Sequence, residues 1–262
     1  MVTALANGRL WGWRARDWAD VQECQMSVAY RTILAKLALN PGQSLLDVGC
    51  GAGMFASMAS ARGLLVSGID ASDALLAIAR ERAPSADFRV GDLEDLPFPG
   101  ESFDAVTGFN AYQFATNPVA ALSAAGRAAK RGAPVVVVIW GRQEAGDAAA
   151  VVAALAPLLA GSRTTSPQAD ALTQEGGLRR FVEDGGLVAP FEVGDVNTEW
   201  SYPSLATAVR GLNSAGSARS AADRTDEDTV TRAHEAALRP YVKVDGTVRL
   251  SAVFRYIIAR AP

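Results

Sequence analysis

Three glycines alternate with small residues after an apolar run, in the sequence Leu-Leu-Asp-Val-Gly-Cys-Gly-Ala-Gly at residues 45–53. The run predicts a buried strand, and Gly49, Gly51 and Gly53 predict a tight turn that leads into a helix. Such a turn is bare of side chains, and the helix adds free N–H groups and the positive end of its dipole. We therefore expect a small molecule with an anionic part to bind at this turn.

Two aspartates follow the next two apolar runs. Asp70 comes after residues 64–69, and Asp92 comes after residues 88–91. Because the carboxyl ends of parallel strands meet at one edge of a sheet, Asp70 is placed to accept hydrogen bonds from both hydroxyls of a ribose. The alternatives are structural: an acidic helix-start residue for Asp70 and a solvated acidic loop for Asp92.

The sequence from residue 45 onward resembles the motifs of class I S-adenosylmethionine-dependent methyltransferases, over about residues 40–140. The dinucleotide fingerprint G-x-G-x-x-G differs, because this chain has G-x-G-x-G and then Met54. The resemblance implies that Asp47 orders the loop and helps hold the methionine amino group, while the glycines pack under the methionine portion. It also implies S-adenosyl-L-methionine as the cofactor and S-adenosyl-L-homocysteine as its product.

The resemblance extends to two further motifs. In the first, Asp92 would take the exocyclic amine of adenine and Leu93 would line the adenine pocket. In the second, residues 109–114, Tyr112 and Gln113 would lie beside the transferred methyl. This motif differs from the Asn-Pro-Pro-Tyr form, which resembles methylators of nucleic acids and protein amines, so those acceptors are less expected. The residues expected at the cofactor are Asp47, Gly49, Cys50, Gly51, Gly53, Asp70, Ala71, Asp92, Leu93, Phe109 and Asn110.

Methyl transfer from a sulfonium is an in-line displacement, so the protein mainly has to align the nucleophile, the methyl and the sulfur. Good alignment can be worth roughly 7 to 11 kcal/mol, and no elaborate catalytic set is required. Neither HExxH nor CxxC occurs, and we expect no metal. A base helps when the acceptor is a hydroxyl or a protonated amine. The catalytic candidates are Tyr112 and His234, the single histidine, for which a structural or solvent-facing role is the commoner one.

Aromatic residues at two places are candidates for contact with the acceptor. Trp11, Trp13 and Trp18 crowd the N-terminal segment, which resembles a flap over the active site and which equally suits a helix covering the core. Trp140 and Trp200 end two predicted strands, where they would stack on a planar or cationic acceptor or pack at the sheet edge. The residues expected to bind the acceptor are Trp18, Tyr112, Gln113, Trp140, Arg210 and Asn213.

Apolar runs alternate with helical patterns along the chain. Strands are expected at residues 45–48, 64–69, 88–91, 102–109, 133–140, 191–200 and 248–259. Ser72 and Asn117 are placed to cap two of the helices between them. This alternation predicts an α/β fold with a doubly wound, Rossmann-like, seven-stranded and mostly parallel sheet. The resemblance implies that the last strand is antiparallel.

A chain of 262 residues can form one large domain, and we predict a single methyltransferase domain over residues 1–262. Residues 1–40 would form an N-terminal helical cap, residues 41–140 the cofactor-binding core, and residues 141–262 the substrate-side half. In that half, a helical insertion at residues 204–243 separates the last two strands and is where we expect substrate specificity to reside. Two helices are expected in it, near residues 205–212 and 226–238.

The composition, with 49% hydrophobic and 20% charged residues, is typical of a soluble globular protein. The net charge is −3 and no cluster of Lys and Arg is visible, so nucleic acid is not an expected partner. Two cysteines cannot form a disulfide framework, no secretory signal is visible, and Pro157 breaks the longest apolar run, residues 148–160. We expect a cytoplasmic protein without membrane contact, a monomer or possible homodimer, with a small-molecule methyl acceptor.

The sequence thus favours methyl transfer from S-adenosylmethionine to a small organic acceptor held under the N-terminal flap and the insertion. One alternative is an NAD(P)-dependent oxidoreductase, because Asp70 also suits the ribose of that cofactor. Another is a non-catalytic protein that binds S-adenosylmethionine as a sensor or scaffold.

Overall fold

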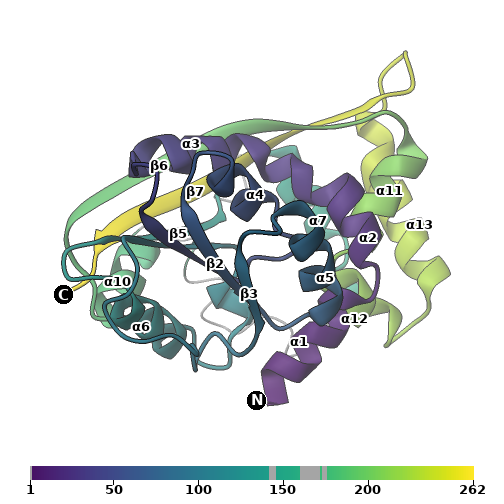
Figure 1. Ribbon diagram of the computed structural model, residues 1–262. Helices are drawn as coiled ribbons and strands as arrows, with labels where there is room; N and C mark the ends of the chain where they lie inside the picture. The colour runs from purple at the N-terminus through teal and green to yellow at the C-terminus, as the bar shows by residue number, and fades with distance from the viewer. Residues whose placement is uncertain (1, 142–145, 160–171, 173–175) are drawn as a thin grey trace.

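The structure, a computed structural model, describes residues 2–141, 146–159, 172 and 176–262 of the chain. Its strands are β1 (Ser44–Val48), β2 (Leu65–Asp70), β3 (Asp87–Val90), β4 (Ala105–Phe109), β5 (Pro134–Trp140), β6 (Val188–Tyr202) and β7 (Val248–Arg260). They form one seven-stranded sheet in the order β3-β2-β1-β4-β5-β7-β6 (Figure 1). β1 to β5 are parallel, whereas β7 is antiparallel to β5 and to β6. The predicted sheet and its antiparallel last strand are confirmed.

Helices cover both faces of the sheet. Those on the first face are α3 (Ser27–Leu37), α4 (Met54–Ser60) and α5 (Asp73–Arg82), and those on the second are α6 (Pro118–Ala128) and α10 (Gly177–Asp184). Val136 of β5 packs in the core with Phe55 of α4, whereas its neighbour Val137 packs in the other core with Phe181 of α10. Successive side chains of a strand point to opposite faces, so β5 is buried on both, as its β-branched run predicts.

The helix starts that face the carboxyl ends of the strands are capped as predicted. The Ser72 hydroxyl accepts a hydrogen bond from the Leu75 N–H at the start of α5 (3.2 Å). Asn117 Oδ1 accepts one from the Ala120 N–H at the start of α6 (3.1 Å). These caps set where each chain segment leaves the sheet edge, which is where the candidate site residues lie.

The insertion between β6 and β7 contains three helices among the described residues, so the prediction of two was incomplete. They are α11 (Leu205–Asn213), α12 (Gly216–Ala222) and α13 (Glu227–Leu238), followed by the 3₁₀ turn η5 (Arg239–Tyr241). The helix missed is α12, whose residues apart from Arg219 are all small and show no apolar period. Its first residue, Gly216, lies against the Trp11 indole, so close that a Cβ there would be 2.8 Å from Nε1. Packing, and not local pattern, explains this helix.

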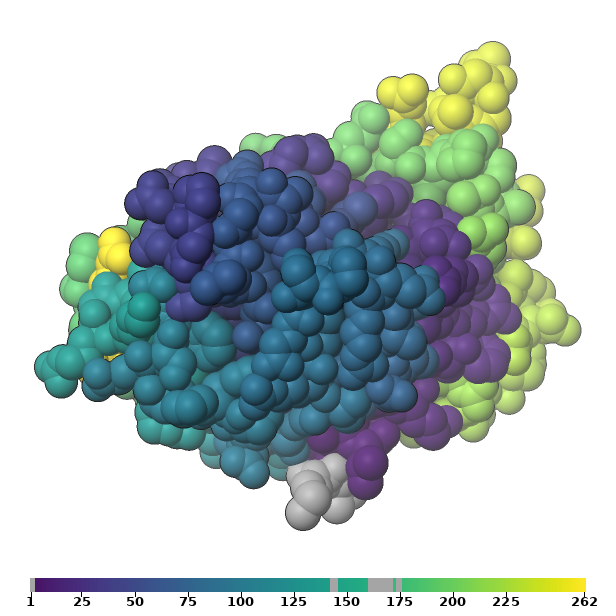
Figure 2. Space-filling view, viewed as in Figure 1, coloured from purple at the N-terminus to yellow at the C-terminus, as the bar shows by residue number. Residues whose placement is uncertain are grey.

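The N-terminal segment is helical, as predicted, and lies between the sheet domain and the insertion. It consists of α1 (Val2–Gly12), α2 (Ala15–Asp17), a π-helical turn η1 (Trp18–Gln22) and a 3₁₀ turn η2 (Glu23–Met26). α1 packs on α5 and on α12, and η1 packs on α11. In Figure 2 this purple segment fills the space between the blue residues of the core and the yellow-green insertion. It therefore forms one wall of the space between the carboxyl edge of the sheet and the insertion.

The remaining described helices are α7 (Asp147–Ala153), α8 (Ala156–Leu159) and the 3₁₀ turn η3 (Tyr112–Phe114). The apolar run that begins at residue 148 thus forms two short helices within its described part. Within the described ranges, we find no helix with both the length and the apolar character needed to cross a membrane. Nor do His, Cys, Asp and Glu side chains of these ranges gather in threes that would suit a metal ion.

Candidate functional site

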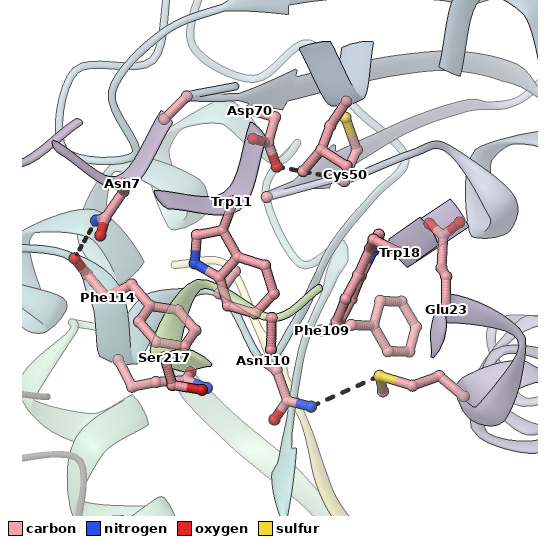
Figure 3. Close-up of a pocket in the computed structure, with 18 of the residues that line it drawn as sticks. Asn7, Trp11, Trp18, Glu23, Cys50, Asp70, Phe109, Asn110, Phe114 and Ser217 are labelled. Atoms are coloured by element: carbon pink, nitrogen blue, oxygen red, sulfur yellow. Dashed lines mark hydrogen bonds between the residues drawn. The ribbon is translucent and has the colours of Figure 1, made fainter. Parts of the chain in front are cut away.

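A cavity of about 380 Å³ lies at the carboxyl ends of the parallel strands, between the sheet edge, the N-terminal segment and the insertion. Figure 3 shows Asp70 and Cys50 on one side, Phe109 and Asn110 on another, and Trp11 and Trp18 of the N-terminal segment beside them. The predicted site residues that line it are Trp18, Gly49, Cys50, Gly51, Asp70, Ala71, Asp92, Leu93, Phe109, Asn110, Gln113, Trp140 and His234. The fold thus brings together most of the residues that the sequence singled out.

The glycine turn forms the floor of the cavity through Gly49 and Gly51. Both have positive φ, 72° and 55°, a conformation that disfavours other residues. Gly53 also has a positive φ of 79°, but it lies outside the cavity lining. A Cβ on Gly53 would be 2.8 Å from the Ala79 Cα of α5. The expectation that Gly53 binds the cofactor is therefore not supported, and its role is the close packing of α4 on α5.

Asp70 closes the turn from the end of β2. Its Oδ2 accepts a hydrogen bond from the Gly51 N–H (2.9 Å), and its Oδ1 accepts one from the Ser72 N–H (2.8 Å). Burial raises the pKa of this carboxyl, and these N–H groups partly oppose the rise. Each oxygen keeps a further lone pair for a ligand, so Asp70 both orders the loop and can bind hydroxyl groups.

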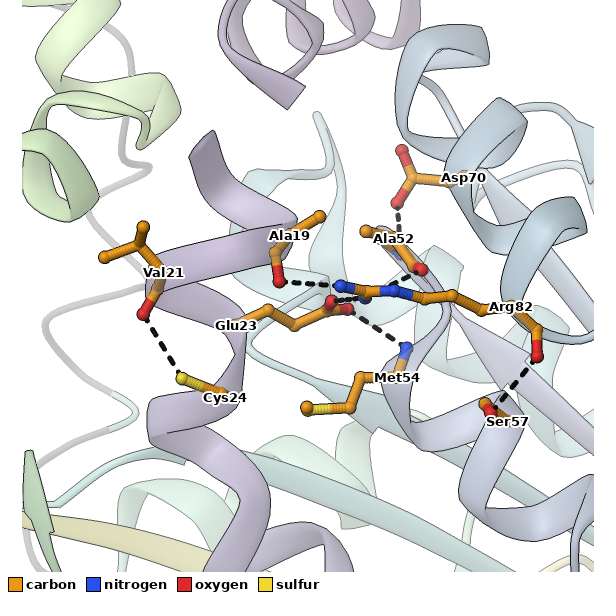
Figure 4. Close-up of polar contacts among 10 residues, drawn as sticks. Ala19, Val21, Glu23, Cys24, Ala52, Met54, Ser57, Asp70 and Arg82 are labelled. Atoms are coloured by element: carbon orange, nitrogen blue, oxygen red, sulfur yellow. Dashed lines mark hydrogen bonds and ion pairs between the residues drawn. The ribbon is translucent and has the colours of Figure 1, made fainter. Parts of the chain in front are cut away.

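Glu23 is a cavity residue that sequence reasoning missed. It is 2% exposed, and its Oε1 accepts a hydrogen bond from the Met54 N–H at the start of α4 (3.3 Å). Arg82 of α5 forms an ion pair with it and donates to the backbone oxygens of Ala52 (3.1 Å) and Ala19 (2.6 Å) (Figure 4). Burial raises the pKa of Glu23 to about 7, against the effect of Arg82. The sequence signal was an acid within a segment predicted to pack over the core.

The carboxylates of Glu23 and Asp70 occupy the N–H groups that we expected to bind an anion. Met54 N–H donates to Glu23 and Gly51 N–H to Asp70. These two N–H groups are therefore already engaged, and the expectation of an anionic ligand part at this turn stays a prediction. Arg82 balances the charge of Glu23, and Asp70 is the second carboxyl group at the turn.

Asp47 lies behind the turn and outside the cavity lining. It is buried in β1, where Thr107 of β4 donates a hydrogen bond to its Oδ1 (2.8 Å). Burial raises the pKa of Asp47 to about 8, and the nearby Glu23 and Asp70 add to the rise. Contact between Asp47 and the methionine amino group is thus not supported, whereas a role in ordering the strand ends is.

Tyr112 was expected to be catalytic, and the structure contradicts this. Its ring is 1% exposed and lies outside the cavity lining, in the core on the opposite face of the sheet from α4. A Cβ on Gly108 would be 2.4 Å from it, and the ring of Phe181 lies 6.2 Å away. Its hydroxyl has no hydrogen-bond partner among the described residues, and burial raises its pKa well above the usual value. The reason is η3, which turns Gln113 toward the cavity and Tyr112 away from it.

Arg210 and Asn213 of α11 were expected to bind the acceptor, and both lie outside the cavity lining. Arg210 is half exposed and pairs with Asp17 (3.2 Å). The Asn213 Oδ1 lies 2.6 Å from Nδ1 of His234, which does line the cavity. Asn213 thus contacts a cavity residue and not the cavity itself.

The insertion side of the cavity is aromatic and almost without charge. Trp140 and Trp200 stand edge to face with ring centroids 5.3 Å apart, and Phe254 of β7 lies 5.1 Å from Trp140. His234 is 2% exposed, and burial lowers its pKa to about 4. Within the described part of the chain, Trp200 Nε1, Asn110 Oδ1 and Gln113 Oε1 are buried without hydrogen-bond partners. This half of the cavity suits an apolar molecule with a few hydrogen-bonding groups.

The sheet order, the antiparallel β7 and a cavity over a glycine turn define the Rossmann-like fold of class I methyltransferases. A solved structure of a putative methyltransferase from Bacillus halodurans has this fold, with a TM-score of 0.61, 17% identity, and coverage of 89% of this chain and 98% of that one.

The sequence comparisons agree. Residues 46–137 match a family described as "Methyltransferase domain". The chain is 32% identical over 112 residues to the malonyl-[acyl-carrier protein] O-methyltransferase of Serratia marcescens, covering 42% of this chain and 44% of that protein. It is 39% identical over 98 residues to the ubiquinone biosynthesis O-methyltransferase of Hahella chejuensis, covering 36% and 41%. The chain thus spans less than half the length of these curated relatives.

Proposed function

We propose that the protein transfers the methyl group of S-adenosyl-L-methionine to a small organic acceptor. The observation that carries the proposal is the arrangement of the glycine turn and its acidic neighbours in the donor half of the cavity. Glu23 and Asp70 line it, and Asp47 is buried behind it. Asp70 lies at the end of β2 beside Gly49 and Gly51, where its oxygens can accept hydrogen bonds from the ribose hydroxyls of S-adenosylmethionine.

The described residues offer a contact for each part of the donor. Gly49 and Gly51 leave room under the methionine portion, and Asp70 can accept hydrogen bonds from the ribose hydroxyls. Asp92 and Leu93 line the cavity where the adenine would lie, with the remaining wall made by Ala71, Phe109 and Asn110. When bound, the sulfonium supplies the methyl group, and the protein supplies alignment.

An NAD(P)-dependent oxidoreductase is the weaker alternative. A pyrophosphate needs free backbone N–H groups at the start of the helix after the glycine turn. Here the N–H groups of Gly51 and Met54 donate to Asp70 and Glu23. An anionic pyrophosphate would have to displace two carboxylates and would be repelled by them.

For the acceptor we propose a mainly apolar molecule with an oxygen nucleophile. Trp18, Trp140, Trp200 and Phe254 give its half of the cavity an aromatic wall. The partnerless Trp200 Nε1, among the described residues, can donate to an oxygen of the acceptor, and Gln113 Oε1 can accept from an O–H. Both curated relatives named above are O-methyltransferases, which favours an oxygen acceptor.

Two measurements test the proposal. Calorimetry should detect binding of S-adenosylmethionine and S-adenosylhomocysteine, with NAD binding far more weakly. Incubation with methyl-labelled donor and a panel of phenols, alcohols, amines and carboxylic acids should then transfer the label. Tighter binding of NAD would reverse the choice of cofactor, and donor binding without any transfer would favour the sensor or scaffold alternative.

The same proposal assigns roles to the segments of the chain. Residues 1–40 act as a cap over both ligands, residues 41–140 bind the donor, and the insertion at residues 204–243 shapes the acceptor half. A cytoplasmic location is consistent with the two free cysteines, Cys24 and Cys50. A net charge of −3 disfavours nucleic acid as the acceptor.

A further inference from the structure

A short chain of hydrogen bonds in the insertion reaches the cavity at His234. Asn213 Nδ2 donates to Thr231 Oγ1 (2.9 Å), which leaves Asn213 Oδ1 facing His234 Nδ1 at 2.6 Å. With the amide in this orientation its carbonyl oxygen accepts, so a neutral imidazole carries its proton on Nδ1. The other ring nitrogen, Nε2, is then unprotonated and has a free lone pair.

The position of these hydrogen bonds determines which edge of the His234 imidazole faces the cavity. His234 lines the cavity, whereas Asn213 and Thr231 lie outside its lining. Since Nδ1 is held from outside, the edge that carries Nε2 is the one left to face the ligand space. The neighbouring lining residues of the insertion, Leu212, Ala215 and Ser217, carry no charge.

The charged side chains on the helices packed against α13 are engaged elsewhere. Arg210 of α11 pairs with Asp17, and Arg219 of α12 pairs with Asp223. On α7, Asp147 accepts hydrogen bonds from Ser251. Burial is the cause of the lowered pKa of His234, and it favours the neutral imidazole. A neutral imidazole with a bare Nε2 is a proton acceptor that is ready at neutral pH.

We propose that His234, held in the Nδ1–H tautomer by Asn213, accepts the proton of a neutral hydroxyl group on the methyl acceptor. This inference rests on the proposed function. The acceptor oxygen forms a bond to the methyl carbon, the carbon–sulfur bond breaks, and its electron pair stays on sulfur. The O–H bond breaks and the proton moves to Nε2, so the products are a methyl ether, a neutral thioether and an imidazolium that later loses its proton to water.

This arrangement selects among acceptor classes. The hydroxyl proton becomes acidic only as the new carbon–oxygen bond forms, so a weak base placed beside it is sufficient. A carboxylate acceptor has no proton to give, and a protonated amine has no lone pair with which to attack the methyl carbon until it has lost a proton in a separate earlier step. The acceptor class is therefore a neutral phenol, enol or alcohol. Asn213 is a positioning residue, and His234 the group that touches the substrate.

The tautomer can be measured without any substrate. His234 is the single histidine of the chain, so protein labelled with isotopic nitrogen in histidine gives one pair of imidazole signals by NMR. We expect Nδ1 to be protonated and Nε2 to be bare at pH 7. Asn213→Asp should keep this tautomer, because aspartate also accepts from Nδ1, whereas Asn213→Ala should release it to a mixture. A wild-type spectrum with the proton on Nε2 would overturn the proposal, whatever the protein catalyses.

Kinetics supply the second test, with a phenol or alcohol that turns over in the acceptor panel. We expect His234→Gln to lower kcat by about 100-fold, at the low end of the usual range for a lost general base, with little change in KM. Asn213→Ala, which removes only the positioning contact, should lower kcat by less. Asn213→Asp should restore most of the rate. Calorimetric binding of S-adenosylmethionine serves as the folding control and should be unchanged. Undiminished kcat in His234→Gln would refute the assignment of the base while leaving methyl transfer intact, and acceptance of carboxylic acids alone would refute the acceptor class.

Discussion

At the scale of single residues, Asp70 has two roles, which a substitution can test. It accepts the Gly51 and Ser72 N–H groups and lines the donor half of the cavity. We expect Asp70→Ala to weaken binding of S-adenosylmethionine by about 1.5 to 3 kcal/mol, roughly 10- to 150-fold in Kd, as for hydrogen bonds to a charged group. Calorimetry measures this. The control is Asp73→Ala, whose exposed carboxylate only pairs with Arg80 at the surface. An unchanged Kd in Asp70→Ala would remove Asp70 from the site.

His234 makes stability depend on pH with a definite sign. Its pKa is lowered from 6.5 to about 4 by burial, so below pH 6.5 the unfolded chain takes up a proton that the folded chain refuses. The folded state should therefore lose about 3 kcal/mol through this group as the pH falls from 6.5 to 4. His234→Gln lacks the group, so urea unfolding at pH 7 and pH 4.5 should show a smaller acid loss in the variant. Equal losses in both proteins would contradict a buried neutral imidazole.

The residues predicted from the sequence differ in why they succeeded or failed. Gly49, Gly51 and Asp70 follow from local rules, because a glycine turn after a strand and an acid at the next strand end meet at one sheet edge. Tyr112 failed because a single turn of 3₁₀ helix decides which of two neighbours faces the cavity. Glu23 was missed because its partners, Met54 and Arg82, are 31 and 59 residues away along the chain.

At the scale of elements, the packing of α4 on α5 depends on Gly53. Both Gly53 and Gly132 have left-handed backbone, with φ of 79° and 71°. A Cβ at Gly53 would meet the Ala79 backbone, whereas one at Gly132 meets nothing within 4 Å. Gly132→Ala should thus lower the free energy of unfolding by about 1 kcal/mol, through the strain of the left-handed backbone alone. Gly53→Ala should cost about 1 to 3 kcal/mol more through overpacking, measured by urea unfolding. Equal costs would show that α5 can move away from the turn.

The strands and capped helices of the first half could be predicted because their signals are local. Ser72 and Asn117 cap helices whose apolar period is regular, and the run at Val135–Ile139 leaves little choice but a buried strand. Helix α12 could not be predicted, since its small residues become helical against the Trp11 ring far away in the sequence. Local patterns thus fixed the donor half of the cavity better than the acceptor half, which tertiary contacts build.

At the scale of the whole molecule, the N-terminal cap is tied to both halves of the cavity. Arg82 joins the cap at Ala19 and Glu23 to the glycine turn at Ala52. On the other side, the Tyr202 hydroxyl donates to Gln22 Oε1 (2.9 Å). Because Trp11, Trp18 and Glu23 line the cavity from the cap, we expect a ligand of the size of S-adenosylmethionine to enter and leave when these ties loosen. Opening of residues 2–26 is then linked to ligand release.

This linkage makes a quantitative prediction for hydrogen exchange. A ligand that binds only the closed state stabilises it by RT ln(1 + [L]/Kd), about 2.7 kcal/mol at a concentration of 100 Kd. Amides of the cap that exchange through cap opening should therefore exchange about 100-fold more slowly with saturating S-adenosylhomocysteine, as measured by mass spectrometry. The control is the exposed turn at residues 243–247, whose opening releases no ligand and whose exchange should not change. If the protein binds the ligand but exchange over residues 2–26 does not change, the cap is not a lid. The free energy of opening the cap would then be the same with and without ligand.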